Sequence, residues 1–285
     1  IRVSLKYTVK IPSDKFTKYG YGKNGEMYLK NCFLLPARYE NNEFVKYNNL
    51  NLDDVANAIS DYDIEIKIPY NFDLFTDLNE IRKETSTDGS YLYRVSGKNR
   101  LDFNLILDNK KDYEIYKNGS LEVICNLKEN KQNDIQRALT VDKIVNYVNE
   151  KMGEYPFEKI TISQTDYDKN PFYGLNQLPV FISPFTEEFL FEIKFLKTYI
   201  NNYLHNSLRL DPRKDNWIYD GMQVYLMMKY IEEFHPESKM MGSVAKLKLL
   251  NGYNLVSLDF NGQYSYFYLL MARKNLDQPL ANTKN

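Results

Sequence analysis

The chain has 285 residues, of which 43% are hydrophobic and 26% are charged, and this composition is typical of a folded globular protein rather than a disordered one. The formal net charge is −1, which gives no support to binding of nucleic acid or of an anionic membrane. The length is sufficient for two domains of ordinary size. No apolar run approaches the roughly 20 residues that a membrane-spanning helix requires, so we expect no membrane span in this chain.

The first 127 residues carry the period-two pattern of β-strands. Residues 1–11 (IRVSLKYTVKI) alternate strictly between apolar and polar side chains, which predicts a half-buried strand. Residues 62–70 repeat this alternation, and 90–95 and 101–107 are also strand-like. Residues 112–126 read as two strands joined at Asn118-Gly119, a strong signal for a hairpin.

The pattern changes to that of helices after about residue 128. Residues 140–153 have helical apolar spacing, with Thr140 as the expected N-cap and Gly153 as the expected end. Short strands are expected at 159–163 and at 177–183. Further helices are predicted over the apolar stripes at residues 186–204, 217–234 and 262–274.

The order of these elements predicts an α+β fold class with two domains. A β-rich domain is expected over residues 1–130, and a mixed, increasingly helical domain over residues 131–285. The two cysteines, Cys32 and Cys125, form no C-x-x-C pair, which excludes a zinc site built from paired cysteines. Two separate buried thiols are expected, with a disulfide as the alternative.

The sequence begins at Ile1 rather than Met, and it shows no signal peptide. We therefore expect a trimmed or processed chain. The cell envelope or periplasm is favoured over the cytoplasm as its location.

One segment of the second half resembles a known family. Residues 154–185 contain YPFEK and then YGLNQLP, and WIYDG follows at 217–221. This order is similar to the core of the aminopeptidase N-like zinc metallopeptidases, or gluzincins, in which a YPF-x-K strand precedes a GAMEN strand, an HExxH helix and a WLNEG helix. The resemblance implies a β-saddle or sandwich domain followed by a thermolysin-like domain. It also implies that this chain is a fragment, which lacks the family's C-terminal helical domain and is incomplete at the end of its thermolysin-like domain.

The residues that the resemblance places at the zinc site have changed. Asp220 takes the place of the glutamate ligand, and counting back through eighteen intervening residues puts residues 197–201 (KTYIN) on HExxH. Lys197 and Asn201 then stand at the two histidine positions, and Thr198 at the catalytic glutamate. A protonated lysine cannot ligate a cation, and threonine cannot accept a proton from water near neutral pH. We therefore expect no catalytic residue, no metal and no other cofactor.

The strand that would contact substrate is changed as well. On the same alignment, Asn176 replaces the glutamate that would hold a substrate α-amino group, and Gly174 and Gln177 are the neighbouring altered positions. Gly174 would still let a backbone approach closely, so a groove could receive a peptide by edge-strand addition.

The hypothesis that follows is a catalytically inactive aminopeptidase-like module that binds peptide or protein or serves as a scaffold, with no nucleic acid partner. The alternative is an active metallo-aminopeptidase with an atypical zinc site, which His205, one turn beyond Asn201, would approach. A third reading is a purely architectural spacer. In the inactive case, a Lys197–Asp220 ion pair would fill the cavity that the metal left, since unpaired buried polar groups cost about 1–3 kcal/mol each.

Overall fold

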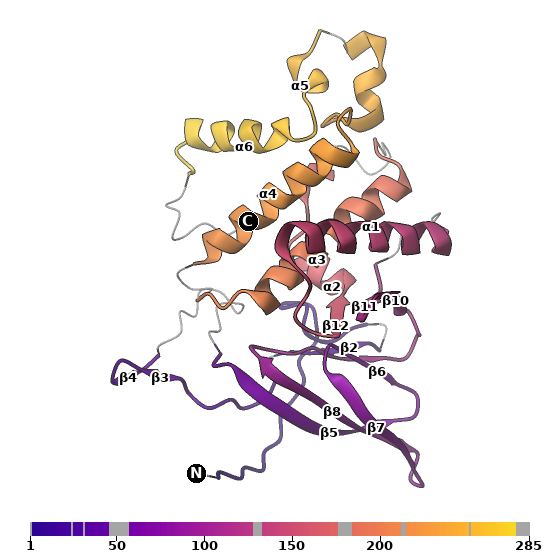
Figure 1. Cartoon of the computed structure of the whole chain (residues 1–285), viewed down its shortest axis with the longest axis vertical. Coiled ribbons are helices and arrows are strands. Elements are labelled where there is room, and N and C mark those ends of the chain that lie inside the picture. Colours follow the sequence, from indigo (N-terminus) through magenta and orange to yellow (C-terminus); the bar gives the residue numbers. More distant parts are fainter. Residues whose placement is uncertain are drawn as a thin grey trace. The chain divides into compact units, whose positions relative to one another are not determined.

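The computed structural model describes residues 2–23, 25–30, 32–45, 57–127, 133–175, 184–211, 215–250 and 252–277. The chain forms two compact units. Unit 1 comprises residues 1–47, 57–126 and 157–161, and unit 2 comprises residues 48–56, 127–156 and 162–285. Unit 1 is built from strands and unit 2 mainly from helices, so the predicted α+β class is confirmed (Figure 1).

Unit 1 contains a four-stranded antiparallel sheet in the order β1-β2-β9-β6. Its strands are β1 (Gly20–Tyr21), β2 (Met27–Leu29), β6 (Asp73–Thr76) and β9 (Leu105–Asp108). All four residues of β9 are buried, as befits a central strand. A polar contact fixes the entry to β9, because the buried Asp77 accepts the backbone N–H of Asn104 at 2.9 Å and its side-chain N–H at 3.1 Å. Burial raises the pKa of Asp77 to about 6.

A second, three-stranded sheet has the order β5-β8-β7 and is antiparallel throughout. Its strands are β5 (Ser60–Pro69), β7 (Asn79–Ser86) and β8 (Ser90–Arg100). The strands predicted at 62–70 and 90–95 are thus confirmed within β5 and β8. The apolar side chains of β5 and β8 pack on Leu78, Phe103 and Leu105 to form the core between the sheets.

The remaining strands form two smaller sheets. One pairs β3 (Tyr39–Glu40) with β4 (Glu43–Phe44). The other has the order β10-β11-β12, from Glu114–Asn118, Leu121–Cys125 and Lys159–Ile162. The predicted hairpin is confirmed, with Asn118 opposite Leu121 and Gly119 in the turn at φ +58°.

The strand predicted for residues 1–11 is wrong for the part that the structure describes. Residues 2–11 belong to no strand, and the apolar side chains Val3, Leu5 and Tyr7 are exposed. Alternation shows that a segment is suited to a sheet, but a strand also requires a neighbour that supplies backbone hydrogen bonds. No such neighbour contacts this segment among the described residues.

Unit 2 is organised around three long helices. These are α1 (Asp134–Met152), α3 (Glu187–Ser207) and α4 (Asn216–Phe234). Shorter elements complete it: α2 (Gln164–Lys169), η1 (Tyr173–Leu175), η2 (Gly242–Lys246), η3 (Lys248–Leu250), α5 (Asn254–Ser257) and α6 (Gly262–Arg273). The helices expected at 186–204, 217–234 and 262–274 are confirmed.

The start predicted for α1 is wrong. Thr140 lies inside the helix, and the N-cap is Asn133, whose side chain accepts the N–H of Ile135 at 2.8 Å. The first two turns of the helix are mostly exposed and carry polar residues, so they lack the apolar spacing from which the start was predicted. Its end at Gly153 is as predicted, with φ +95°.

Three further expectations have different outcomes. Cys32 and Cys125 are both free thiols, as expected, but only Cys125 is buried and Cys32 is partly exposed. The strand expected at 177–183 lies outside the described residues. Among the helices of the described part of the chain, none has the length and apolar character needed to cross a membrane.

Candidate functional site: a buried lysine between two helices

The helices α3 and α4 pack against each other, as the sequence predicted. The start of α3 is fixed by Thr186, whose side chain accepts the N–H of Phe189 at 3.3 Å, and by acidic residues in the first turn that favour the positive end of the helix dipole. Eleven of its 21 residues are buried. A helix that is buried on most sides places even its polar residues in the interior, so each of them needs a partner.

Lys197 is the most unusual of these residues. It is 6% exposed, and its Nζ donates a hydrogen bond to Oε1 of Gln223 on α4 at 3.0 Å. The same glutamine returns a hydrogen bond from Nε2 to the carbonyl oxygen of Lys197 at 2.9 Å. Burial lowers the pKa of Lys197 to about 8, although the nearby Asp220 carboxylate acts in the opposite direction. The ammonium is thus held by a neutral amide from the next helix.

Thr198, the neighbour of Lys197, is also buried and is turned toward its own helix. It is 3% exposed, and Oγ1 donates to the carbonyl oxygen of Lys194, one turn earlier, at 2.9 Å. This bond back to the preceding turn is a common arrangement for threonine within helices. A hydroxyl held in this way offers no base to an incoming water molecule.

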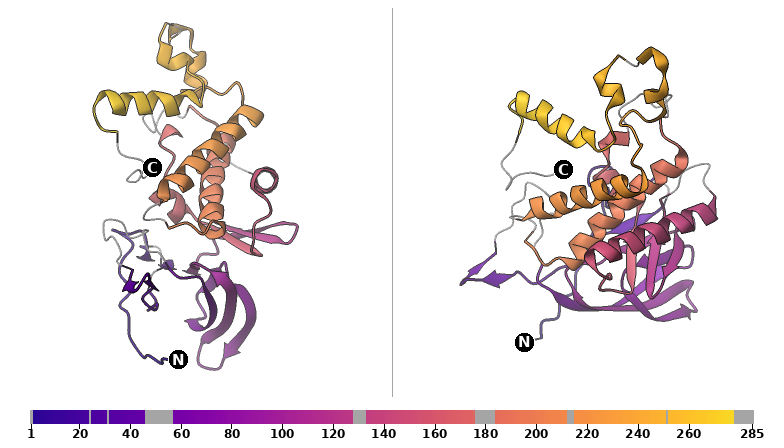
Figure 2. Two further views of the ribbon diagram at one scale, coloured as in Figure 1. Left: turned by 60° about the vertical axis from the view of Figure 1, so that its left-hand side comes forward. Right: turned by 45° about the horizontal axis from the view of Figure 1, so that its top comes forward.

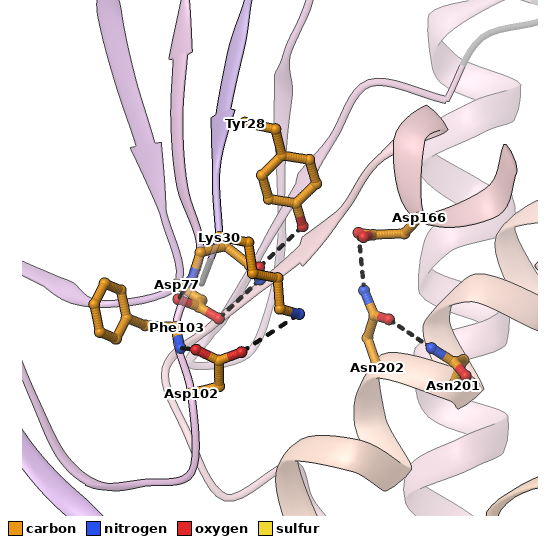
Figure 3. A network of polar contacts seen from close by, with 9 residues as sticks. Tyr28, Lys30, Asp77, Asp102, Phe103, Asp166, Asn201 and Asn202 are labelled. Atoms are coloured by element: carbon orange, nitrogen blue, oxygen red, sulfur yellow. Dashed lines mark hydrogen bonds and ion pairs between the residues drawn. The ribbon is translucent and has the colours of Figure 1, made fainter. Parts of the chain in front are cut away.

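Asn201 lies one turn after Lys197 and takes part in a chain of amide contacts. Its Nδ2 donates to Oδ1 of Asn202 at 3.0 Å, and Nδ2 of Asn202 donates to Asp166 on α2 at 3.3 Å (Figure 3). These contacts join α3 to α2 through side chains that have no metal-binding imidazole. Asn202 therefore ties α3 to α2, and Asn201 bonds to it from the same helix.

Asp220 lies in the first turns of α4, and His205 lies in the last turn of α3. Asp220 accepts a hydrogen bond from Asn216, one turn earlier on α4, at 3.0 Å. The ring of His205 stacks on Tyr219 with centroids 4.3 Å apart, and its Nδ1 lies 2.9 Å from the carbonyl oxygen of Asn201. Since a carbonyl can only accept, Nδ1 carries the proton and only Nε2 remains as an acceptor.

This set of residues does not fit zinc. Protein ligands of zinc are imidazoles, thiolates and carboxylates, and structural or catalytic sites use three or four of them. The positions that the sequence resemblance singles out supply an ammonium, a hydroxyl, an amide and one carboxylate. In the part of the chain that the structure describes, no group of three His, Cys, Asp or Glu side chains is placed to hold a metal ion.

The surroundings of Gly174 differ from the strand that the resemblance implies. Gly174 lies in the 3-10 turn η1 rather than in a strand, and the side chain of Gln263 fills the space next to it. A Cβ atom at this position would lie 1.9 Å from Oε1 of Gln263 and 2.6 Å from the ring of Phe172. The close approach that only glycine permits is therefore made by a side chain of the same unit. Asn176 and Gln177 lie outside the described residues.

A second polar centre in unit 2 was not found from the sequence. Glu192, one of the buried residues of α3, receives contacts from three donors: Lys143 of α1, Tyr230 of α4, and Nε2 of His235 at 2.9 Å. Burial by itself would raise the pKa of Glu192, but the hydrogen bonds from His235, Lys143 and Tyr230 outweigh it and lower the pKa to about 2. A glutamate within an otherwise apolar stripe is the signal that could have revealed it.

Unit 1 holds a separate polar network around the entry to β9, and Figure 3 includes it. The hydroxyl of Tyr28 donates to Oδ1 of Asn104 at 2.9 Å, and Lys30 lies 3.6 Å from the carboxylate of Asp102. The same Asp102 accepts the N–H of Phe103 at 2.8 Å. These contacts hold the loop before β9 to β2 and account for the buried polar groups there.

Comparison with known proteins gives a likeness at the level of structure only. No family model matches the sequence, and no curated protein does so either. The chain is similar to a mutant form of an M1 zinc metallopeptidase from Deinococcus radiodurans, with 13% identity, a TM-score of 0.48, and coverage of 91% of this chain and 53% of that one. For the same enzyme without that mutation, the identity is 12%, the TM-score is 0.46, and the coverages are 82% and 50%. For the mutant bound to a Tyr-Ser-Ala substrate, the identity is 12%, the TM-score is 0.41, and the match covers 87% of this chain and 58% of that one. The chain thus spans about half the length of the solved structures that it matches.

Proposed function

We propose that this chain is a non-catalytic, aminopeptidase-like module that acts by binding protein or peptide or as a scaffold. In this proposal, residues 1–130 form the β-rich domain and residues 131–285 the metallopeptidase-like domain. Lys197, Thr198, Asn201 and Asp220 occupy the positions of a lost zinc site, and no side chain in that set supplies catalysis.

The observation that carries the proposal is the burial of Lys197 with Gln223. At the position where a first imidazole ligand is expected, the chain has a cation fixed by an amide at 3.0 Å. A second cation cannot be accommodated beside an ammonium, because like charges in a region of low dielectric repel strongly. Thr198 and Asn201 support this reading, since each is bound within the helices rather than held open for a ligand.

A binding role is supported by the surface of α6. Tyr268 and Leu269 are 63% and 64% exposed, and Tyr266, Phe267 and Met271 are exposed as well. Exposed apolar patches of this kind are typical of surfaces that contact other molecules. The groove at Gly174 does not contribute to the proposal, since Gln263 fills it.

The direct test measures metal content and peptidase activity of the unmodified chain. Protein purified without chelator should contain less than one-tenth equivalent of zinc by elemental analysis. It should release nothing above blank from aminoacyl reporter substrates, with or without added zinc. Peptidase activity that requires zinc and disappears with chelator would refute the proposal and favour an active enzyme with an atypical site.

A four-fold reversion tests whether the alignment behind the proposal is correct. Lys197→His, Thr198→Glu, Asn201→His and Asp220→Glu together place two imidazoles and a carboxylate on adjacent helix faces. We expect this variant to bind one zinc ion in a titration, while a matched variant that keeps Lys197 and carries only the other three changes should not. If the four-fold variant is folded by circular dichroism and binds no zinc, residues 197–201 do not correspond to the zinc-binding helix.

A further inference from the structure

An extended arm begins unit 1. Residues 2–11 alternate between apolar side chains (Val3, Leu5, Tyr7, Val9, Ile11) and polar ones, and the charged members of the polar set are Arg2, Lys6 and Lys10. Val3 and Leu5 are 73% and 69% exposed. Figure 2 draws this arm as a plain trace without an arrow, and among the described residues no backbone–backbone hydrogen bond joins residues 2–11 to a neighbour. A side-chain contact is present, in which the N–H of Leu34 donates to the hydroxyl of Tyr7 at 3.4 Å. The arm has the pattern of an edge strand but has no sheet.

The β5 strand offers a sheet with the complementary pattern. It is an edge strand in the order β5-β8-β7, so one row of its backbone groups has no strand beside it among the described residues. Its solvent-exposed face carries Asp61, Asp63 and Glu65. Two cations on that face are already paired, Lys67 with Asp88 and Arg94 with Asp63. Asp61 and Glu65 then leave the face acidic overall.

The opposite face of β5 faces the core but is only partly buried. Tyr62, Ile64 and Ile66 pack on the buried cluster of Leu78, Val95, Phe103 and Leu105, but they are themselves only partly buried. An added strand would cover these three side chains on their open side. Each large apolar side chain that becomes fully buried contributes stabilisation, which gives the edge a reason to accept an apolar partner.

One antiparallel register satisfies both faces of β5 at once. When Lys6 is placed opposite Glu65, Lys10 falls opposite Asp61, and opposite charges on directly paired residues stabilise a sheet. On the other face, four of the five apolar residues of the arm then meet an apolar residue of β5, and the fifth, Ile11, falls opposite Ser60. The pairs are Val3 with Ile68, Leu5 with Ile66, Tyr7 with Ile64, and Val9 with Tyr62.

The far end of the arm is bonded to β1, which is in a different sheet from β5. The N–H of Tyr21 in β1 donates to the carbonyl oxygen of Pro12 at 2.9 Å, and the N–H of Asp14 donates to Tyr21 at 3.0 Å. These bonds anchor the arm to the sheet that contains β1, whereas β5 belongs to the other sheet. An arm anchored at one end and exposed along its length is suited to exchange with another molecule.

We propose that the edge of β5 is a strand-addition site whose occupant is residues 3–10 of a second copy of this chain. Reciprocal exchange of the two arms gives a symmetric dimer with two identical added strands. This inference does not depend on the proposed function, because it uses only unit 1.

Charge reversal in two complementary variants provides the test. The full chain should have twice the mass of the 33.8 kDa monomer by light scattering at micromolar concentration. Lys6→Glu with Lys10→Glu, and separately Asp61→Lys with Glu65→Lys, should each shift the protein to monomer, because each creates like charges across the added strand. A matched control, Lys246→Glu with Lys248→Glu in η2 and η3, changes the net charge equally and should leave the dimer intact.

Mixing the two monomeric variants gives the sharpest outcome. In a mixture, the acidic arm of one meets the basic β5 of the other, and the unchanged arm and edge also match. We therefore expect a heterodimer to form at a level close to that of the unmodified chain. A mixture that stays monomeric would overturn the proposal, as would a monomeric mass for the unmodified chain.

A cysteine pair distinguishes exchange between chains from pairing within one chain. Tyr7→Cys with Ile64→Cys places two thiols directly opposite in the proposed register, where Cβ atoms lie about 4.5–5.5 Å apart. Mild oxidation should give a cross-linked species of twice the monomer mass on a non-reducing gel. Tyr7→Cys with Glu65→Cys, whose side chains lie on opposite faces, should cross-link far less. A cross-link that leaves the mass at that of one chain would show pairing within the chain and refute the second copy as occupant.

Discussion

Replacing Lys197 by methionine should change the dependence of stability on pH in a way that no other single substitution in α3 would. Methionine keeps the length of the side chain but removes the charge. The pKa of Lys197 falls from 10.5 to about 8 on burial, a difference of about 2.5 units. At about 1.4 kcal/mol per unit, the protonated lysine costs the folded state roughly 3 kcal/mol at pH 7.

The sign follows from counting protons. Between pH 8 and pH 10.5, Lys197 is protonated in the unfolded chain and mostly neutral in the folded one, so the unfolded state binds more protons and stability rises with pH. The cost of the buried charge is thus fully present below pH 8 and is relieved toward pH 10.5. The methionine variant has no such dependence at this position.

Methionine also leaves Oε1 of Gln223 without its donor from Lys197, which costs about 1–3 kcal/mol at every pH. Combining the two effects, we expect the variant to be more stable than the unmodified chain by about 0–2 kcal/mol at pH 7. Near pH 10.5 it should be less stable by about 1–3 kcal/mol.

Urea unfolding at pH 7, 8, 9 and 10 measures the difference directly. Because tyrosines also titrate in this range, the difference between variant and unmodified protein is the useful quantity, rather than either stability alone. Leu196→Met is a matched control, since it alters a buried neighbour on the same helix without changing a charge, and its difference should stay constant with pH. A constant difference for Lys197→Met would show that the amine is not buried as a cation, and the reasoning would fail.

Two other predictions concern unit 2. Glu192→Gln should destabilise the protein by on the order of 3 kcal/mol in urea unfolding, since it leaves Lys143 and His235 without their anion. Because the pKa of Glu192 in the folded state is lowered to about 2, its contribution to the free energy of unfolding is present above the unfolded value of 4.5 and is lost as pH falls toward 2. The stability of the variant should therefore depend less on pH over that interval. An unchanged acid unfolding curve would contradict the assignment. Gly174→Ala should lower the thermal midpoint and cost about 1–3 kcal/mol of stability, because its Cβ would lie 1.9 Å from Oε1 of Gln263. Gly221→Ala on α4 is the matched control, since its Cβ would meet no neighbouring atom within 4 Å. It should be neutral or should stabilise the helix by up to about 1 kcal/mol. Equal effects of the two substitutions would count against the packing described at Gly174.

The parts of the fold that the sequence predicts well are those in which the apolar pattern and the burial agree. The helices α3 and α4 carry continuous apolar stripes, and the expected ranges of 186–204 and 217–234 are close to Glu187–Ser207 and Asn216–Phe234. The hairpin of β10 and β11 is predicted because Asn118-Gly119 between two strand-like segments strongly favours a tight turn.

The errors arise where the outcome depends on distant contacts. Residues 2–11 have a strand pattern without a neighbour in the described structure, and pairing is not encoded in one strand alone. Thr140 is a good N-cap by type, but Asn133 takes that position. The turns between them bury no apolar side chain, since Ile135 and Leu139 are exposed, so the apolar pattern does not mark the true start. A local pattern predicts which structure a segment can adopt, while tertiary contacts decide where it begins.

At the candidate site too, the sequence predicts the element but not the contacts that its side chains make. The alignment of residues 197–201 places Lys197 on α3, but it does not indicate that Gln223, one turn beyond Asp220, supplies its hydrogen-bonding partner. The sequence predicts an ion pair with Asp220 for the inactive case, but the structure gives the ammonium a neutral amide as its hydrogen-bond partner, with the carboxylate nearby. Which of two neighbouring polar groups meets a buried cation is decided by side-chain geometry over a few ångströms.

The burial of α3 has a consequence for how the evolutionary record of this protein should be read. Eleven of its 21 residues are enclosed, including a lysine, a glutamate and a threonine that each need a specific partner. Substitutions at such positions are removed by selection because they disturb packing, whether or not any reaction takes place there. Among descendants of this sequence, the segment that we propose to align with a zinc-binding helix should therefore change slowly. Invariance in this helix would measure the constraint of a full interior and would not distinguish an enzyme from a protein that has ceased to be one.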